Sequence, residues 1–126
     1  MLDSNLLQER LESILEALER VPRRFATIRS PQDFVASEEG REHLDSICMV
    51  LLSVGEAFRQ IDEKTKGEFL SQYPQIPWRA VIGMRHVLAH DYFNVNKEVI
   101  FNTCEMQIIP LMNTIRHMLQ DLRKEL

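Results

Sequence analysis

The sequence lacks a long hydrophobic run, which excludes a membrane-spanning helix. Its longest unbroken apolar stretch, Ile47 to Leu52, is far shorter than the roughly 20 residues that a helix needs to cross a bilayer. The first residues, Met1 to Asn5, also lack the basic and apolar regions of a signal peptide. We therefore expect a cytoplasmic protein with no membrane segment.

Cysteine, glycine and proline are also scarce. The chain of 126 residues contains two cysteines, four glycines and five prolines, and it has no low-complexity tract, so it is neither fibrous nor disordered. Cys48 and Cys104 lie in helix-like apolar patterns, and we expect both to be reduced and to pack as small hydrophobic side chains. The length predicts a single domain over residues 1–126.

An excess of positive charge is absent as well. The formal net charge is −4, which argues against a protein that coats nucleic acid with a strongly basic surface. A local basic site is still compatible with this value, because the stretch between residues 79 and 97 contains a single acid, Asp91. The basic side chains of this stretch belong to Arg79, Arg85, His86, His90 and Lys97.

Apolar residues recur at helical spacing almost throughout the chain, and no run alternates as a strand would. A leucine-rich stripe that starts at Leu2 predicts a first helix, with Asp3 or Ser4 as its N-cap and its end before Pro22. Ser30-Pro31 predicts the start of a short helix that carries Phe34 and Val35. A long central helix is expected over residues 38–64. Its segment 47–52 is apolar on every side of the helix, which predicts that other parts of the protein pack against it on several sides.

The second half of the chain predicts two further helices. After a loop over residues 66–77, Pro77 is suited to the first position of a helix through Trp78, which ends at a turn over residues 91–96. A last long helix starts near Lys97, and Pro110 should kink it. Together these patterns predict an all-α fold, an antiparallel up-and-down bundle of four to five helices that dimerises through its helices.

Two residues in the helical patterns need a special explanation. Gly55 interrupts the central helix, which costs about 1 kcal/mol relative to alanine, and close approach of another helix would justify it. Arg85 lies on the apolar stripe of the Trp78 helix, where a guanidinium must be paired or must face a cleft. Glu56, on the central helix, is a candidate partner for Arg85.

Arg85, His90 and Tyr92 form the pattern R-x4-H-x-Y. On a continuous helix, five residues turn about 140° beyond a full circle, so Arg85 and His90 would not share a face. Either the helix ends near Ala89 and the turn redirects His90, or Arg85 of one protomer acts beside His90 of another. Metal-independent RNA cleavage needs proton transfer and positive charge on the phosphate, which histidine and arginine can supply.

Several short motifs resemble those of the HepT-like branch of the HEPN superfamily, in order and spacing, from about residue 47 to residue 122. These motifs are Gly55-Glu56-Ala57, Tyr73-Pro74-Gln75-Ile76-Pro77-Trp78, Gly83-Met84-Arg85, His90-Asp91-Tyr92-Phe93 and Ile109-Pro110-Leu111.

The resemblance implies an all-helical homodimer that acts as the ribonuclease toxin of a toxin–antitoxin pair. Its antitoxin would be a small nucleotidyltransferase of the MNT type. By correspondence of motifs, Arg85 and His90 would be the catalytic pair, and the antitoxin would adenylylate Tyr92. An AMP group at Tyr92 would block the cleft by occupancy and repulsion. No cofactor is expected, and the substrate would be RNA.

Two supporting positions depart from the common pattern of that branch. His86 stands where asparagine is common, and Asp91 stands where glycine is frequent. Asp91 would either raise the proton affinity of a neighbouring histidine or repel RNA and weaken the nuclease.

Each motif also has a structural interpretation. Arg85 could be satisfied by Glu56 alone, and Tyr92 could be an ordinary core aromatic. His86 and His90 could form half of a zinc site, but the further ligands nearby are limited to Asp91 and the remote Cys104, so we expect no metal. The alternative function is a non-catalytic subunit that docks a nucleotidyltransferase and presents a substrate, or Tyr92, to it.

Overall fold

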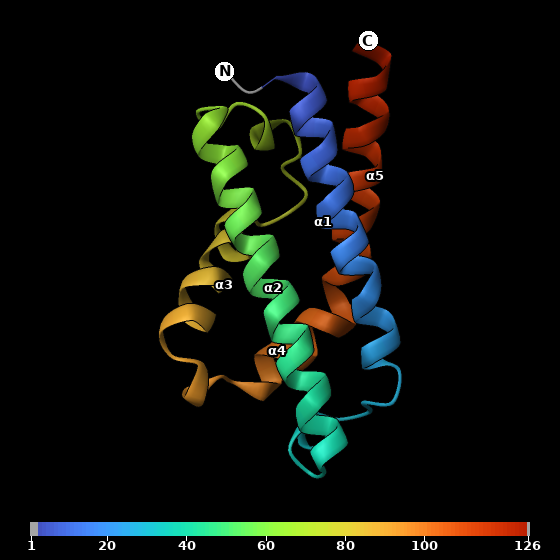
Figure 1. Ribbon diagram of the computed structural model, residues 1–126, viewed down its shortest axis with the longest axis vertical. Helices are drawn as coiled ribbons and strands as arrows, with labels where there is room; N and C mark the ends of the chain where they lie inside the picture. Colours follow the sequence, from blue (N-terminus) through green and yellow to red (C-terminus); the bar gives the residue numbers. More distant parts are fainter. Residues whose placement is uncertain (1–2, 126) are drawn as a thin grey trace.

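The three longest helices run side by side and form the long axis of the molecule (Figure 1). In this computed structural model, residues 3–125 are described. The long helices are α1 (Ser4–Phe25), α2 (Glu38–Lys64) and α5 (Ile108–Glu125). Two shorter helices, α3 (Trp78–His90) and α4 (Lys97–Met106), complete the bundle, and no strand occurs among the described residues. The prediction of an all-α bundle is confirmed.

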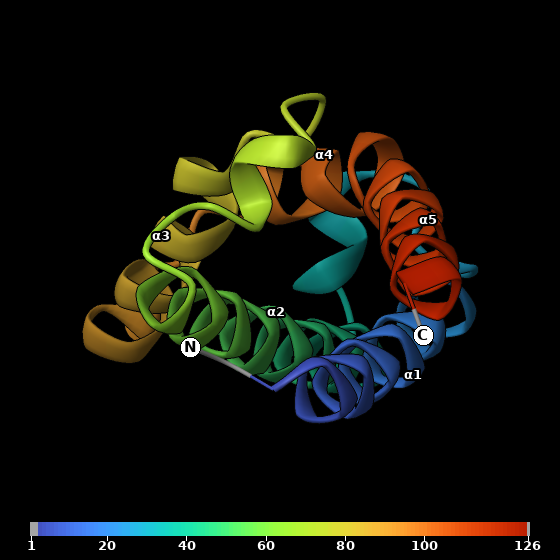
Figure 2. The ribbon, with the colours of Figure 1, turned by 90° about the horizontal axis from the view of Figure 1, so that it is seen from above.

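Helix α2 is central because it packs against α1 on one side and against α3 on the other. Helix α1 in turn packs against α5, and Figure 2 shows the helices arranged around a common interior. Within the described residues, no helix is long and apolar enough to cross a membrane.

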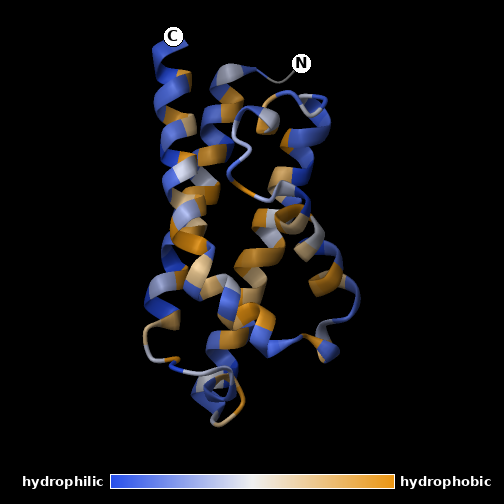
Figure 3. Ribbon diagram, turned by 180° about the vertical axis from the view of Figure 1, so that it is seen from behind, coloured by the Kyte–Doolittle hydropathy of each residue, from blue (hydrophilic) through white to orange (hydrophobic). Residues whose placement is uncertain are grey.

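Apolar side chains on the inward faces of the helices form one core. Figure 3 shows hydrophobic residues recurring between hydrophilic ones along the helices. Helix α1 contributes Leu11 and Leu18, and α5 contributes Ile115 and Met118, all fully buried. Cys48 and Cys104 are buried free thiols, as expected, and burial raises the pKa of each thiol to about 12.

The predicted end of the first helix before Pro22 is wrong, because α1 continues through Pro22 to Phe25. The ring of Phe25 packs against Phe34 and Phe101, with centroid distances of 6.3 and 5.1 Å. These aromatic contacts hold the last turn of the helix in place after the proline. Asp3 occupies the N-cap, although its side chain makes no capping hydrogen bond. Leu2, which the sequence pattern included in this helix, lies outside the described residues.

The elements between α1 and α2 agree closely with the prediction. Pro31–Phe34 forms a short 3-10 helix, η1, with a capping box between Ser30 and Asp33. Val35 falls just outside it and is exposed. Helix α2 starts at Glu38, and its N-cap Ser37 accepts a hydrogen bond from the Gly40 amide at 2.9 Å.

The expectation that residues 47–52 are covered on several sides is wrong at one position. Ile47, Val50 and Leu51 are buried, but the side chain of Met49 is 63% exposed. Because α1 and α3 flank α2 on two sides, a strip of its surface stays open to solvent at this level.

The last predicted helix is two helices. Instead of a kink at Pro110, the chain breaks at Gln107, between α4 and α5, and α4 turns away from the α5 axis (Figures 1 and 2). Pro110 cannot donate the hydrogen bond that a continuous helix would direct to the Met106 carbonyl, which accounts for a break at this point. Pro77 also differs from the prediction: it is the N-cap of α3 and not its first helical residue.

Candidate functional site

Gly55 lies where α3 passes close to α2. A Cβ atom built at Gly55 would lie 2.9 Å from the Cβ of Arg85 and 3.0 Å from the carbonyl oxygen of Val81. Such distances are shorter than normal contacts, so a side chain at this position would push the two helices apart. The prediction that this glycine permits close helix approach is confirmed. Arg85 is the α3 residue that packs against it.

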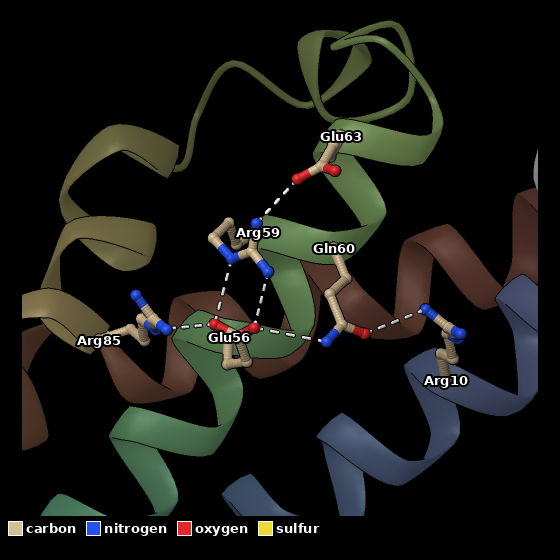
Figure 4. Close-up of polar contacts among 6 residues, drawn as sticks. All are labelled: Arg10, Glu56, Arg59, Gln60, Glu63 and Arg85. Carbon is tan, nitrogen blue, oxygen red and sulfur yellow. Dashed lines mark hydrogen bonds and ion pairs between the residues drawn. The ribbon is translucent and has the colours of Figure 1, made fainter. Parts of the chain in front are cut away.

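Glu56 holds the Arg85 guanidinium beside this contact. The Nε of Arg85 lies 2.7 Å from Oε2 of Glu56, as Figure 4 shows. The two terminal nitrogens of Arg85 make no hydrogen bond to any described residue, and its side chain is 37% exposed. Arg85 is therefore fixed through Nε, while Nη1 and Nη2 are open to solvent. That geometry leaves the part of the guanidinium that binds phosphate available.

A second arginine, which the sequence reasoning did not identify, binds the same carboxylate. Arg59 donates to both Glu56 oxygens, at 2.8 and 3.1 Å, and to Glu63 at 2.7 Å (Figure 4). Its spacing from Glu56 and Glu63 along α2, three and four residues, is a recognisable sequence signal for ion pairs on one helix. Weaker contacts of 3.4 Å extend the cluster through Gln60 to Arg10 on α1.

This cluster keeps Glu56 ionised. The hydrogen bonds from Arg59, followed by those from Gln60 and the positive charges of Arg59 and Arg85, lower the pKa of Glu56 from 4.5 to about 2. The carboxylate is thus fully charged at neutral pH, and it can anchor Arg85 across the whole physiological range.

Helix α3 continues through His90. The ring of His90 lies 4.5 Å from the ring of His86, centroid to centroid, which is the contact expected of helical neighbours four residues apart. The helix ends one residue beyond the predicted end near Ala89, and His90 is still helical, so the turn does not redirect its side chain. Arg85 points to α2, while His90 lies about 140° away around the helix and is exposed.

The exposed side of α3 carries small and apolar residues next to its basic ones. Ala80 and Gly83 are exposed, Val87 is 51% exposed, and a Cβ atom added at Gly83 would meet nothing within 4 Å. Beyond the helix, the Phe93 ring is fully exposed. This outward side therefore has room for a second protein chain.

The Asp91 side chain is hydrogen-bonded within the turn that follows α3, and not to a histidine. Its Oδ1 accepts a hydrogen bond from Asn94 Nδ2 at 2.9 Å, and no ion pair joins it to His86 or His90 among the described residues. The expectation that Asp91 acts on a neighbouring histidine has no support in this geometry. Asp91 remains an exposed negative charge next to His90.

Tyr92 connects the end of α3 to α2. Its hydroxyl donates to the Asp45 carboxylate and lies beside Cys48. Burial, together with the Asp45 hydrogen bond, raises the pKa of Tyr92 well above its usual range, so the hydroxyl stays protonated. A recess of about 200 Å³ opens next to it, lined by Asp45, Cys48, Met49, Leu52, Leu88 and Tyr92. The sequence carried no signal for Asp45, because its partner is 47 residues away.

The basic stretch between residues 79 and 97 is partly neutralised by neighbours. Arg85 pairs with Glu56, and Lys97 lies 3.7 Å from Glu98. Arg79, His86 and His90 remain exposed on α3. Among the described residues, no group of three or more histidine, cysteine, aspartate or glutamate side chains is arranged to hold a metal ion.

Comparison with known proteins relates most of this chain to ribonucleases. A protein of Thermococcus cleftensis named "Probable ribonuclease HepT" is 31% identical over 98 residues, which cover 78% of this chain and 82% of the relative. A candidate RNase of Caldanaerobacter subterraneus is 33% identical over 67 residues, and one of Methanocaldococcus jannaschii is 29% identical over 72.

The matches to these two candidate RNases cover 53% and 57% of this chain, respectively, and 56% of the length of each relative. No solved structure matches the chain at a significant level. The family model described as Ribonuclease HepT-like matches residues 7–118, a range that contains the Glu56–Arg85 pair, both α3 histidines and Tyr92. This protein therefore belongs to the HepT-like ribonuclease family.

Proposed function

We propose that this protein is a metal-independent endoribonuclease, with Arg85 and His90 as its catalytic pair. The observation that carries the proposal is the state of Arg85, which Glu56 fixes through Nε while Nη1 and Nη2 make no hydrogen bond to any described residue. A fixed guanidinium can hold two phosphate oxygens at once, and a neighbouring imidazole can transfer protons near neutral pH. Membership of the HepT-like family supports this assignment.

The active cleft forms between two protomers in this proposal. Arg85 and His90 lie on different sides of α3, so one straight helix cannot present both to the same phosphate. Symmetric packing through the exposed Gly83 and Val87 would bring His90 of one protomer toward Arg85 of its partner. The open outward side of α3 supports this arrangement.

Membership of the HepT-like family supports a proposal for the biological role. We infer a toxin–antitoxin pair in the cytoplasm, in which an MNT-type nucleotidyltransferase adenylylates the Tyr92 hydroxyl. Tyr92 follows His90 by two residues, so an AMP group there would bring a negatively charged phosphate close to the site where substrate phosphate binds. As the bond from the phenol oxygen to the α-phosphorus of ATP forms and pyrophosphate leaves, the phenol gives up the proton that it now donates to Asp45.

Nuclease assays with AMP-free protein test the catalytic assignment. Arg85→Ala and His90→Ala should each abolish cleavage of RNA in the presence of a metal chelator, and the product should carry a 2′,3′-cyclic phosphate. His117→Ala is the control, because this exposed histidine lies on α5. Cleavage that survives in both α3 variants would reject the proposed site.

Adenylylation and dimerisation have separate tests. After coexpression with an MNT-type nucleotidyltransferase, intact-mass analysis should show added AMP on the natural protein and none on Tyr92→Phe. Sedimentation should show a dimer at micromolar concentration, and Val87→Glu should dissociate it. A natural protein that sediments as a monomer would eliminate the shared cleft.

The second candidate function is a docking subunit without nuclease activity. Two observations favour it: Glu56 already neutralises Arg85, and the exposed Asp91 adds a negative charge beside His90. A docking subunit would accept AMP or bind the nucleotidyltransferase without cleaving any RNA. The nuclease assay therefore separates the two functions.

A further inference from the structure

We propose that Asp45 is the proton acceptor in the adenylylation of Tyr92, so that this chain supplies a catalytic residue for its own modification. The inference rests on the proposed toxin–antitoxin function and deepens it, because it assigns the group that takes the phenol proton. Its basis is the hydrogen bond that the Tyr92 hydroxyl donates to Oδ1 of Asp45, beside a recess that both residues line.

Packing of α2 against the segment after α3 brings the two side chains together. Tyr92 is the first residue of a short 3-10 helix, η3 (Tyr92–Asn94), and its side chain is half-buried. Asp45 lies on α2 and is exposed, and no ion pair joins it to a basic side chain among the described residues. The phenol is therefore held in place by a carboxylate whose negative charge is not neutralised and which is in contact with water.

The phenol of Tyr92 needs a proton acceptor in order to react. Burial and the Asp45 hydrogen bond hold the pKa of Tyr92 well above its usual range, so almost none of the side chain is phenolate at neutral pH. A neutral phenol is a weak nucleophile, and an adjacent base activates it by removing the proton as the new bond forms. Asp45 already accepts this proton in a hydrogen bond.

The reaction balances with Asp45 as the base. The phenol oxygen forms a bond to the α-phosphorus of ATP, the bond from that phosphorus to pyrophosphate breaks, and the phenol proton moves to the Asp45 carboxylate. The nucleotidyltransferase supplies the ATP, and water then removes the proton from the exposed carboxyl group. In protein kinases an aspartate likewise accepts the proton of the substrate hydroxyl during phosphoryl transfer.

The recess beside the pair leaves room for the nucleotide. Its volume is about 200 Å³, and Met49, Leu52 and Leu88 form its apolar lining. The side chain of Met49 is 63% exposed, so the recess lies on the strip of α2 that no other helix covers. ATP held by a nucleotidyltransferase can therefore approach the phenol on this side of α2.

Other groups near the phenol are less suited to accept its proton. Asp91 is hydrogen-bonded to Asn94. Burial raises the pKa of the Cys48 and Cys104 thiols to about 12, so both stay protonated and neither is a base at neutral pH. The His90 ring contacts the ring four residues earlier on α3 and accepts no hydrogen bond from the phenol. The remaining competitor is a base of the nucleotidyltransferase, which would make a base on this chain unnecessary.

Transfer of AMP to purified, AMP-free protein by an MNT-type nucleotidyltransferase with ATP and Mg²⁺ tests the proposal. Asp45→Asn should lower kcat for the transfer by about 100-fold or more at neutral pH, the usual contribution of a general base, and should leave the KM for the acceptor protein unchanged. Asparagine still accepts a hydrogen bond from the phenol but takes no proton, so the loss of rate reports proton transfer. Asp45→Glu should regain part of the rate.

Glu42→Gln is the matched control. Glu42 is an exposed acid three residues before Asp45 on α2, so its substitution removes the same charge from the same surface. This variant should accept AMP at the natural rate. Circular dichroism should show that it and both Asp45 variants are folded.

A pH profile separates proton transfer from a structural role. Hydroxide can replace a missing base, so the ratio of the natural rate to the Asp45→Asn rate should fall as the pH is raised from about 7 to about 9. The same nucleotidyltransferase acts in both reactions, so its own pH dependence cancels in this ratio. A structural role for Asp45 would leave the ratio constant.

The outcomes are distinguishable. If natural protein accepts AMP on Tyr92 and Asp45→Asn accepts it equally fast, the proposal is overturned while the toxin–antitoxin function stands. A slow Asp45→Asn whose deficit is the same at every pH also overturns it. If AMP-free natural protein accepts no AMP, or if Tyr92→Phe accepts it equally well, the proposed adenylylation of Tyr92 and the catalytic role of Asp45 fail together.

Discussion

The Nε of Arg85 lies 2.7 Å from Oε2 of Glu56, and this contact sets the direction in which α3 presents its arginine. The same carboxylate binds Arg59, so its orientation is itself fixed from the α2 side. Glu56 therefore acts through Arg85 and contacts no substrate atom in the proposed mechanism. It is a positioning residue.

Glu56→Gln should lower the RNA cleavage rate by about 10- to 100-fold, because a guanidinium displaced by about 1 Å loses much of its effect on the transition state. The measurement is kcat with AMP-free dimer. Glu63→Gln is a matched control, since Glu63 bridges Arg59 but does not touch Arg85. Equal rates for Glu56→Gln and Glu63→Gln would show that the ion pair has no part in catalysis.

Substituting two glycines should change stability in opposite directions. Gly55→Ala would place a Cβ atom 2.9 Å from Arg85 Cβ, and the resulting shift of α3 should destabilise the protein by about 1–3 kcal/mol. Within one protomer a Cβ atom at Gly83 meets nothing within 4 Å, so Gly83→Ala should stabilise the helix by about 0.5–1 kcal/mol when it is measured in the Val87→Glu monomer. Urea denaturation of both variants measures the difference. A neutral Gly55→Ala would mean that α3 is not held tightly against α2.

The acid behaviour of the protein should depend on Glu56. Its pKa is lowered from 4.5 to about 2 in the folded state, so its contribution to stability is fully present above the ordinary value and is lost as the pH falls from 4.5 toward 2. The difference in unfolding free energy between the natural protein and Glu56→Gln should be constant from pH 7 to about 5 and should shrink below that. A difference that disappeared already between pH 7 and 6 would contradict the lowered pKa.

Tyr92→Phe should destabilise the junction between α3 and α2 by about 0.5–1.5 kcal/mol, since it removes the hydrogen bond to Asp45. Asp45→Asn should cost less, because the amide oxygen still accepts from the hydroxyl. Thermal unfolding compares the two variants with natural protein. If Asp45→Asn were the more damaging change, the charge of Asp45 and not its hydrogen bond would hold the junction.

The sequence was sufficient for the features that depend on local chemistry. The bounds of α2, the α3 helix and the approach of another helix at Gly55 could all be predicted from residue type and spacing. The Glu56–Arg85 pair could also be predicted from the sequence, because an arginine on an apolar stripe requires a partner. Arg59 could have been found by its spacing from Glu56 and Glu63.

The features that were missed depend on contacts between distant segments. Asp45 reaches Tyr92 only because α2 and α3 pack side by side, and no local pattern encodes that pairing. Met49 is exposed because no helix covers that strip of α2, which helical periodicity alone cannot show. The end of α1 was misplaced because proline normally terminates a helix, whereas here Phe25 packs against Phe34 and Phe101 and extends it.

The continuation of α1 past Pro22 leads to a prediction about this proline. The proline lies inside α1 and is exposed, and it leaves the Leu18 carbonyl without the hydrogen bond that an amide at position 22 would donate. Pro22→Ala should restore this bond and stabilise the protein by about 1–2 kcal/mol, less than the full helix penalty of about 3 kcal/mol because alanine also makes the unfolded chain more flexible. Phe25→Ala should have the opposite effect, by removing the aromatic contacts that hold the last turn. If Pro22→Ala were destabilising, the proline would be favouring the folded backbone at this turn, and the contacts of Phe25 would not be the reason that α1 continues past it.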